Sequence, residues 1–376
     1  MSFVVLTNIP TPYRTAFFDA LAEEAACAGK RFHVLYCAKT EPGRHWPYDP
    51  AKMKHAHTVL RGFHPSLTGI HAHLNPGVLA ELNLLKPDTL LIAGSWNTPT
   101  MLIAGLNIYS QAPRRFFWSE GHADAAQHKS GLIAWLRRRV YRTFDGFAVP
   151  NAKSAEWAIA QVGGSRQLVT LPNAIAAKEF ARPSASARQE VRRQLGLAGA
   201  GRVLLQVGLL DSAKGAPELA KAFLRMRPTL PSNTVLAFAG SGPAESELQD
   251  LAEESQDSIR LFGQLSPEGI QKALWAADIF ILNTRRDANP LSAIEASAAG
   301  LPIVMSAAAG NISEIVEAPD AGFVIRDPAD PTEALRAVLS ASDEQLAVMG
   351  MRAAANAKRF DAPVVARSLI KQLYPR

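Results

Sequence analysis

The stretch VLLQVGLLDSAKGAPEL, residues 203–219, decides the fold of this chain. Its opening run, VLLQV, is short, mostly aliphatic and followed by Gly208, which is typical of a buried strand. A turn follows, and the Ala-Pro-Glu after Lys214 and Gly215 is a sequence that begins helices. Because a buried strand followed directly by a helix is the repeating unit of parallel sheets, this stretch predicts an α/β fold.

The same alternation runs through all 376 residues and restarts once, after an Ala-, Ser- and Pro-rich segment at 174–190. We therefore predict two doubly wound domains, one over 1–180 and one over 181–357, with a last helix, 358–376, that returns to the first domain. The predicted strands are FVVLTN (3–8), FHVLYC (32–37), LLIAG (90–94), RFFW (115–118), GFAVP (146–150), LVTLP (168–172), VLLQVG (203–208), VLAFAG (235–240), IRLF (259–262), IFILN (279–283), LPIVM (301–305) and GFVI (322–325).

Charge and cysteine content narrow the class of protein. Residues 1–180 hold 19 Lys and Arg against 12 Asp and Glu, whereas residues 181–376 hold 21 against 22, so the whole excess of positive charge lies in the first half. Cys27 and Cys37 have no paired spacing, and no segment has the length or leader of a membrane span or signal. We expect a cytoplasmic protein, either free or peripheral on the inner face of the membrane.

Two glycine-containing loops follow predicted strands at the edge where parallel sheets bind ligands. In the first, Lys214 stands at a helix start, where its ammonium and the helix N–H groups can meet phosphate; a solvated lysine in an ordinary turn is the alternative. In the second, AGSGPAESEL (239–248), Glu245 stands where a dinucleotide fingerprint has a small residue, and no GK[ST] motif occurs. A nicotinamide dehydrogenase is therefore disfavoured.

Four motifs taken in order resemble the donor-binding domain of family-4 glycosyltransferases, which are retaining enzymes of the GT-B fold. They are VGLLDSAKG (207–215), FAGSGPAESEL (238–248), RDANPLSAIEASAAGLPIV (286–304) and GNISEIVEAPDAGFVI (310–325). TNIPTPYRTAFFDAL (7–21), LYCAKTEPGRHW (35–46), FWSEGHAD (117–124) and LPNAI (171–175) resemble, more weakly, the acceptor half of members that build bacterial surface polysaccharides.

The resemblance implies a GT-B fold, in which two Rossmann-like domains face each other across a cleft. It implies transfer of a sugar, with retention, from a nucleotide diphosphate sugar to a glycan or lipid-linked acceptor in polysaccharide or cell-envelope glycan biosynthesis. The donor is then a substrate, and no cofactor is expected. No Asp-x-Asp pair that would hold a divalent ion occurs in the sequence, so we expect a metal-independent enzyme.

The family's signature of an acid, seven residues and a glutamate appears here as Asp287 and Glu295. The resemblance assigns Asp287 to hydroxyls of the donor sugar and Glu295 to the ribose hydroxyls of the nucleotide, and it assigns Lys214 to the diphosphate. Family members typically carry an arginine at the position of Leu209. Either arginine before Asp287 could supply this guanidinium, and solvated loop arginines are the alternative. The expected donor-binding set is Gly208, Lys214, Gly242, Arg285, Arg286, Asp287, Asn289, Pro290, Leu291 and Glu295, of which Lys214 and Asp287 are also expected to be catalytic.

On the acceptor side the expected residues are Arg14, in the loop after the first strand, and Glu120 and His122, in FWSEGHAD. The resemblance makes His122 the third catalytic candidate. The pairs His55/His57 and His71/His73 have the i, i+2 spacing of a strand but no third ligand at metal-like spacing, so we interpret them as structural or surface residues.

The segment KSGLIAWLRRRVYRTF, residues 129–144, combines apolar and basic side chains on one predicted helix. Residues 129–142 either lie on an anionic membrane surface or pack their apolar side on the sheet with the arginines solvated. Nucleic acid is a poorer partner, because no stacking motif accompanies the charge. The side chains concerned are Leu132, Ile133, Trp135, Leu136 and Val140, with Lys129, Arg137, Arg138, Arg139 and Arg142.

Two other functions remain open at this point. One is a nucleotide-sugar 2-epimerase, which shares the GT-B architecture. The other is a non-catalytic nucleotide-binding relative, which the leucine at position 209 suggests.

Overall fold

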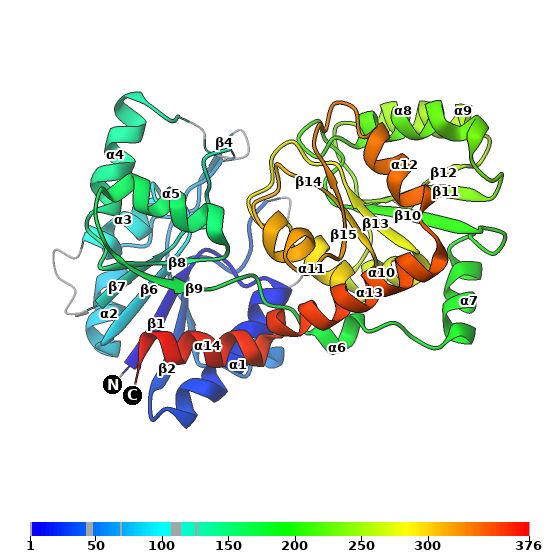
Figure 1. The fold of residues 1–376 in the computed structure, drawn as a ribbon. Coiled ribbons are helices and arrows are strands. Elements are labelled where there is room, and N and C mark those ends of the chain that lie inside the picture. The colour runs from blue at the N-terminus through cyan, green and yellow to red at the C-terminus, as the bar shows by residue number, and fades with distance from the viewer. Residues whose placement is uncertain are drawn as a thin grey trace. The chain divides into compact units, whose positions relative to one another are not determined.

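The structure is a computed structural model that describes residues 2–42, 48–67, 70–106, 114–124, 126 and 128–375. The chain forms two compact units, one of residues 1–175 with 361–376 and one of residues 176–360 (Figure 1). The sequence places the corresponding boundaries at 180 and 357. We call the two units the N-terminal unit and the C-terminal unit.

The N-terminal unit is built on a parallel sheet with the strand order β3-β2-β1-β6-β7-β8-β9. Strand β1 pairs in register with β2 on one side and β6 on the other, so that Leu6 lies beside Leu35 and Ile92. The strands are β1 (Ser2–Thr7), β2 (Arg31–Tyr36), β3 (His57–Val59), β6 (Thr89–Ala93), β7 (Arg114–Trp118), β8 (Gly146–Val149) and β9 (Gln167–Thr170), with a separate antiparallel pair, β4 (Ser66–Leu67) and β5 (Ile70–His71).

Helices cover both faces of this sheet. Helices α1 and α14 contribute to the hydrophobic cluster on one face, through residues such as Phe17 and Leu369, and Figure 1 shows the two helices side by side. The other face packs against α2 to α5, through residues such as Leu82 and Met101. The helices are α1 (Pro12–Cys27), α2 (Val78–Leu85), α3 (Pro99–Leu106), α4 (Gly131–Tyr141), α5 (Ala152–Val162) and α14 (Ala362–Leu373), with a 3-10 turn at Pro50–Lys52.

The C-terminal unit repeats the design with a parallel sheet in the order β12-β11-β10-β13-β14-β15. The strands are β10 (Arg202–Val207), β11 (Thr234–Ala239), β12 (Ile259–Leu261), β13 (Ile279–Leu282), β14 (Ile303–Ser306) and β15 (Gly322–Ile325). The helices are α6 (Ala177–Phe180), α7 (Ala185–Gln194), α8 (Ala216–Met226), α9 (Glu245–Glu254), α10 (Pro267–Ala276), α11 (Leu291–Ala298), α12 (Thr332–Ser340) and α13 (Asp343–Ala357), with short turns at Arg227–Thr229, Ser313–Glu317 and Lys358–Phe360.

Strand order fixes where each unit can hold a ligand. In the N-terminal unit, β2 and β3 are added on one side of β1, and the strands from β6 onward are added on its other side. In the C-terminal unit, β11 and β12 lie on one side of β10 and the strands from β13 onward lie on the other. Loops that leave the carboxyl ends of strands on either side of such a point diverge and leave a crevice. The loops after β1 and β6, and those after β10 and β13, are therefore the first places to look for a site. Among the described helices, none is long and apolar enough to span a bilayer.

Candidate functional site

Glycines allow two loops of the C-terminal unit to touch backbone to backbone. Gly240, after β11, has a φ of +147°, and a Cβ on it would lie 1.9 Å from the carbonyl oxygen of Gly208, after β10. The amide of Leu210 donates to Ser241 O at 3.0 Å across the same contact. No side chain larger than hydrogen fits at position 240, which explains why the sequence has glycine there.

The β10–α8 loop holds Lys214 in a fixed backbone position. The Lys214 amide donates to Asp211 Oδ1 at 2.8 Å, and its carbonyl accepts from Gln206 Nε2 at 3.1 Å. Gly215, which follows, has a φ of +59°, and a Cβ there would lie 2.2 Å from Asn283 O at the end of β13. The β10–α8 loop is thus packed against the end of β13, the neighbour of β10 in the sheet.

The ammonium of Lys214 forms an ion pair with the carboxylate of Asp287, so the structure brings together two of the predicted residues 73 positions apart. Both side chains are partly exposed, at 22% and 16%. The Asp287 loop is tied to the lysine loop, since Arg285 N and Thr284 Oγ1 both donate to Ala213 O, at 2.7 and 3.0 Å. A cation and an acceptor-only carboxylate therefore stand together at this edge of the sheet.

Helix α11 begins directly after this loop, with Pro290 at its N-cap and Leu291 as its first residue. No side chain caps its first turn, and Asn289 and Pro290 are buried. The hydroxyl of Ser292 donates to Val207 O at 3.2 Å and ties the helix start to the end of β10. Uncapped N–H groups and the positive end of the helix dipole form an anion site of the kind that binds diphosphates.

Glu295 lies one turn further along α11 and is only slightly exposed. Burial raises its pKa to about 7. The carboxyl group of Glu295 therefore holds its proton to a much higher pH than an exposed glutamate does. Hydroxyl groups that donate to it would favour the ionised form.

The two arginines before Asp287 differ in their surroundings. Arg285 Nη2 lies 2.7 Å from Glu218 Oε1 on α8, so its charge is already paired. Arg286 is exposed and makes no ion pair with any described residue. Leu209, where the resemblance led us to expect an arginine, is 54% exposed. Of the predicted substitutes for that arginine, Arg286 is the one that the structure leaves available.

The N-terminal unit has a hollow of about 450 Å³ at the carboxyl ends of β1, β6 and β7, where the strand order reverses. Arg14 is one of the residues that line it. The Arg14 guanidinium stacks on Trp118 at 4.7 Å, donates to Thr7 Oγ1 at 2.9 Å and lies 3.5 Å from Glu120 Oε1. The predicted pair Arg14 and Glu120 thus meets in this hollow.

Sequence reasoning missed a buried acid in the same hollow. Glu41 lines it and is 7% exposed, and its Oε1 lies 2.9 Å from His73 Nε2. His73 Nδ1 lies 3.0 Å from His64 Nδ1, so a chain of three titratable side chains backs the hollow. A buried carboxylate needs such a partner. Glu41 lies in the stretch LYCAKTEPGRHW (35–46), which the sequence analysis quoted without singling out this residue; residues 43–46 of that stretch fall outside the described residues.

The structure places His122 away from this hollow. The imidazole is fully buried, 3.9 Å from Asp124 Oδ2, and does not line the hollow, although Glu120 and Gly121 do. Its contact with a substrate stays a prediction. His55 is also buried and bonded to Asp19 and Tyr36, at 2.6 and 2.9 Å. In the described part of the chain, no group of three or more His, Cys, Asp or Glu side chains could hold a metal.

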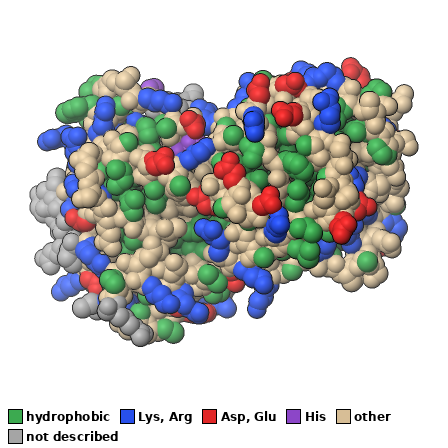
Figure 2. All heavy atoms as spheres, in the orientation of Figure 1, with side chains coloured by type: hydrophobic (Ala, Val, Ile, Leu, Met, Phe, Trp, Pro, Cys, Tyr) green, Lys and Arg blue, Asp and Glu red, His purple; other side chains and the backbone are tan. Residues whose placement is uncertain are grey.

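Helix α4 turns its apolar side outward. Leu132 is 70% exposed and Trp135 is 55% exposed, whereas Arg137 is buried, stacked on Trp157 at 4.9 Å and bonded to Gln161. The interpretation in which the apolar side packs on the sheet is therefore wrong, because Ala134, Arg137 and Tyr141 fill that position. Figure 2 shows apolar and basic side chains together at the surface over α4.

Fold and sites define a class: an α/β protein of two Rossmann-like units, each with polar groups gathered where its strand order reverses. Residues 187–360 match the model of the family described as Glycosyl transferases group 1. This match covers most of the C-terminal unit, and it agrees with the resemblance read from the sequence.

Curated proteins that resemble this chain agree with this match. The D-inositol 3-phosphate glycosyltransferase of Corynebacterium kroppenstedtii is 29% identical over 211 residues, which are 54% of this chain and 46% of that protein. The protein of the same name from Geodermatophilus obscurus is 33% identical over 165 residues, which are 41% of this chain and 36% of that protein. The chain thus spans less than half the length of these relatives.

Solved structures confirm the fold over the whole chain. HepE of Anabaena, crystallised in complex with UDP, has a TM-score of 0.73 at 19% identity, with 99% of each chain covered. Sucrose-phosphate synthase of Thermosynechococcus elongatus has a TM-score of 0.72 at 17% identity, with 100% of this chain and 98% of that chain covered. The fold is that of the GT-B glycosyltransferases.

Proposed function

We propose that the protein is a retaining, metal-independent glycosyltransferase that moves a sugar from a nucleotide diphosphate sugar to a hydroxyl of a glycan or lipid-linked acceptor. The observation that carries the proposal is the Lys214–Asp287 ion pair beside the uncapped start of α11. A cation and free helix N–H groups suit a diphosphate, and a carboxylate suits sugar hydroxyls. We propose that it acts in polysaccharide or cell-envelope glycan biosynthesis and that it is located in the cytoplasm.

The reaction breaks the bond between the anomeric carbon and the diphosphate oxygen and forms a bond from that carbon to the acceptor oxygen on the same face. Lys214 and the α11 N–H groups stabilise the negative charge that grows on the departing diphosphate. Asp287 exchanges its contact with Lys214 for the donor's hydroxyls. The acceptor hydroxyl gives its proton to an oxygen of the departing diphosphate, so no protein base is required.

In the N-terminal unit, Arg14, Glu41 and Glu120 line the proposed acceptor site. Trp118 stacks under Arg14 and holds its guanidinium at this site. The carboxylates would accept bonds from acceptor hydroxyls. His122 takes part only if the segment around it opens.

Donor screening with the full chain tests this function. UDP comes first, because HepE was crystallised with it, and GDP and ADP follow in a thermal-shift assay; the sugar nucleotides of the stabilising base are then tested for transfer and hydrolysis. Transfer with retained anomeric configuration and without added metal supports the proposal. Epimerised donor formed without acceptor would indicate the 2-epimerase, and binding with neither transfer nor hydrolysis would indicate a non-catalytic relative.

We further propose that α4 docks the N-terminal unit on an anionic membrane surface. Leu132, Ile133, Trp135 and Leu136 are all at least 42% exposed, and Lys129 and Arg139 are exposed beside them. An apolar face bordered by cations suits the boundary between anionic headgroups and acyl chains.

Vesicle sedimentation tests this docking. Leu132→Ser with Trp135→Ser should abolish binding to vesicles that contain phosphatidylglycerol, and Lys129→Glu with Arg139→Glu should remove its salt sensitivity. Arg137 is left unchanged, because it is buried. The matched control is Leu84→Ser, since Leu84 is 76% exposed on α2. Equal binding by the wild type and the Leu132/Trp135 variant would contradict the proposal.

A further inference from the structure

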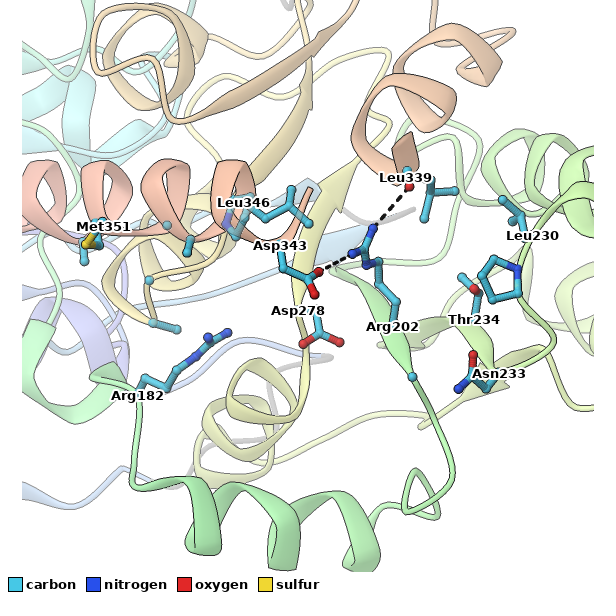
Figure 3. Close-up of a pocket in the computed structure, with 18 residues that line it drawn as sticks. Arg182, Arg202, Leu230, Asn233, Thr234, Asp278, Leu339, Asp343, Leu346 and Met351 are labelled. Carbon is cyan, nitrogen blue, oxygen red and sulfur yellow. Dashed lines mark hydrogen bonds and ion pairs between the residues drawn. The ribbon is translucent and has the colours of Figure 1, made fainter. Parts of the chain in front are cut away.

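The C-terminal unit has a hollow of about 780 Å³ at the edge of its sheet opposite Lys214 and Asp287 (Figure 3). It is lined by residues at the amino ends of strands, namely Arg202 of β10, Thr234 of β11 and Asp278 just before β13. Because all strands of this sheet are parallel, the loops that carry Lys214 and Asp287 leave from the other edge. The hollow therefore does not belong to the donor site.

Positive charge exceeds negative charge on one side of this hollow. Both carboxylate oxygens of Asp278 are engaged, since Arg188 Nη2 lies 2.5 Å from Oδ1 and Arg192 Nη2 lies 2.6 Å from Oδ2. Oδ2 also accepts from Val203 N at 2.8 Å. The third guanidinium, that of Arg182, is close enough to interact electrostatically with all three. Three arginines around one aspartate leave a local charge of +2.

Arg182 is the member of this cluster that lines the hollow. It donates to Ala277 O at 3.2 Å and forms no ion pair with any residue that the structure describes. Arg182 is exposed to solvent, and partial burial, followed by repulsion from Arg188, lowers its pKa. A negatively charged group beside Arg182 would offset both effects.

On the other side of the hollow, α13 contributes apolar side chains beside the ion pair of Asp343 with Arg202. Helix α13 contributes Leu346, which is buried, and Met351, which is 64% exposed. Gly350, between them, lets α13 touch the turn before β14, because a Cβ there would lie 2.3 Å from Gly300 O. Figure 3 shows Arg182 and Asp278 on one side of the open space and Leu346 and Met351 on the other. The Met351 side chain can adapt its shape to an apolar ligand.

We propose that this hollow binds an amphiphilic anion, specifically a phosphate monoester of an apolar chain, with the phosphate against Arg182 and the chain along Leu346 and Met351. A phosphate monoester carries close to two negative charges at neutral pH, which matches the +2 of the arginine cluster. Inorganic phosphate would leave the apolar side uncovered, and a neutral alcohol would leave Arg182 without a counter-charge. The site is independent of the proposed transfer reaction.

Calorimetric titration of the full chain with octyl phosphate, octanol and inorganic phosphate tests the site. Octyl phosphate should bind saturably and at least tenfold more tightly than either of the others. Arg182→Ala and Met351→Glu should each weaken octyl phosphate at least tenfold, the first by removing the cation and the second by placing a negative charge on the apolar side. Arg225→Ala is the matched control, since Arg225 is an exposed arginine of the same unit, ion-paired with Asp330.

Three results would overturn the proposal: no saturable binding of octyl phosphate, equal affinity for octyl phosphate and octanol, or undiminished affinity in both variants. Met351 is exposed, so Met351→Glu should fold even if Arg182→Ala does not. Unchanged thermal unfolding of each variant without ligand is checked first.

Discussion

The two candidate sites occupy the same place in two similar sheets, yet their charged groups are assembled differently. In the C-terminal unit, Lys214 and Asp287 each stand in a loop that directly follows a strand, and Glu295 is on the helix after the second loop. In the N-terminal unit, Arg14 comes from the start of α1, Glu41 from a long loop, and its partner His73 from beyond the β4–β5 pair.

This difference shows how far motif order can be used to locate a site. Where a site is built from short strand-to-helix turns, the residues beside the glycines and prolines are the functional ones. Where it is built from long loops, the contacts depend on how those loops fold onto one another. The four predictions below test whether the donor residues act on separate parts of the donor and whether the acceptor residues act on the acceptor alone.

The largest effect is expected for Asp287→Asn. The substitution removes the charge and replaces an acceptor oxygen with a donor, so loss of two hydroxyl bonds should cost about 2–4 kcal/mol, or roughly thirty- to a thousandfold in kcat/KM. Free nucleoside diphosphate should bind as well as before, because this carboxylate contacts the sugar. Asp287→Glu should lose less. Asp330→Asn, in an exposed ion pair with Arg225, is the control. Untouched transfer by Asp287→Asn would refute the assignment.

Glu295→Gln should raise stability at high pH. The wild-type pKa of about 7, against a usual 4.5, means that between these values the folded chain holds a proton that the unfolded chain has lost. Stability contributed by this proton is full below pH 4.5 and is lost as pH rises through 7. Glutamine avoids the loss, so the variant should exceed the wild type by up to about 3 kcal/mol at pH 8 and by little at pH 4.

The same substitution should weaken nucleotide binding, since ribose hydroxyls need the carboxylate. Wild-type affinity should rise by about tenfold more than that of the variant between pH 6 and pH 8, as Glu295 ionises. Denaturant unfolding and nucleotide titration at the two pH values measure both effects. Exposed Glu333→Gln is the control. A pH dependence of binding that is identical in wild type and Glu295→Gln would exclude the ribose role.

Lys214→Ala should lower nucleoside diphosphate affinity by about ten- to a hundredfold, which is the value of a charge-assisted bond of about 1.5–3 kcal/mol. Nucleoside affinity should be unchanged, because the ammonium contacts only phosphate. Isothermal titration of each ligand measures this, with Lys221→Ala, paired with Glu247 on the same unit, as control. Equal losses for nucleoside and diphosphate would show that Lys214 acts on the fold of the loop instead.

The smallest effect is expected for Glu41→Gln. Loss of one acceptor bond should raise KM for the acceptor by about five- to tenfold, or about 1 kcal/mol, with donor hydrolysis unchanged. His73→Gln keeps a side chain that can donate to Glu41 but does not titrate, and it should change acceptor KM less than Glu41→Gln does. Steady-state kinetics with acceptor varied at saturating donor measures both. A fall in donor hydrolysis as large as the fall in transfer would break the division of roles between the two units.

The positions of Lys214 and Asp287 in strand-to-helix turns could be predicted from the sequence, because each turn has a local cause. Gly208, Gly215 and Gly240 all have positive φ, and a Cβ at 215 or 240 would clash with backbone. These turns determine the position of Lys214. The state of Glu295 could not be read in this way, since its pKa depends on how deeply neighbouring elements bury it. The ion pair of Arg285 with Glu218, which leaves Arg286 available, could not be predicted from the sequence either, because the two residues are far apart in the chain.

The sequence by itself determined the two parallel sheets, their alternation with helices and the resemblance of the C-terminal unit to glycosyltransferases, because hydrophobic period and turn chemistry act over a few residues. Only the tertiary structure decided that α14 packs beside α1, that α4 exposes Leu132 and Trp135 while burying Arg137, and that His73 supports Glu41. Each of these depends on which surfaces remain uncovered after distant segments have packed, and a local pattern carries no information about that.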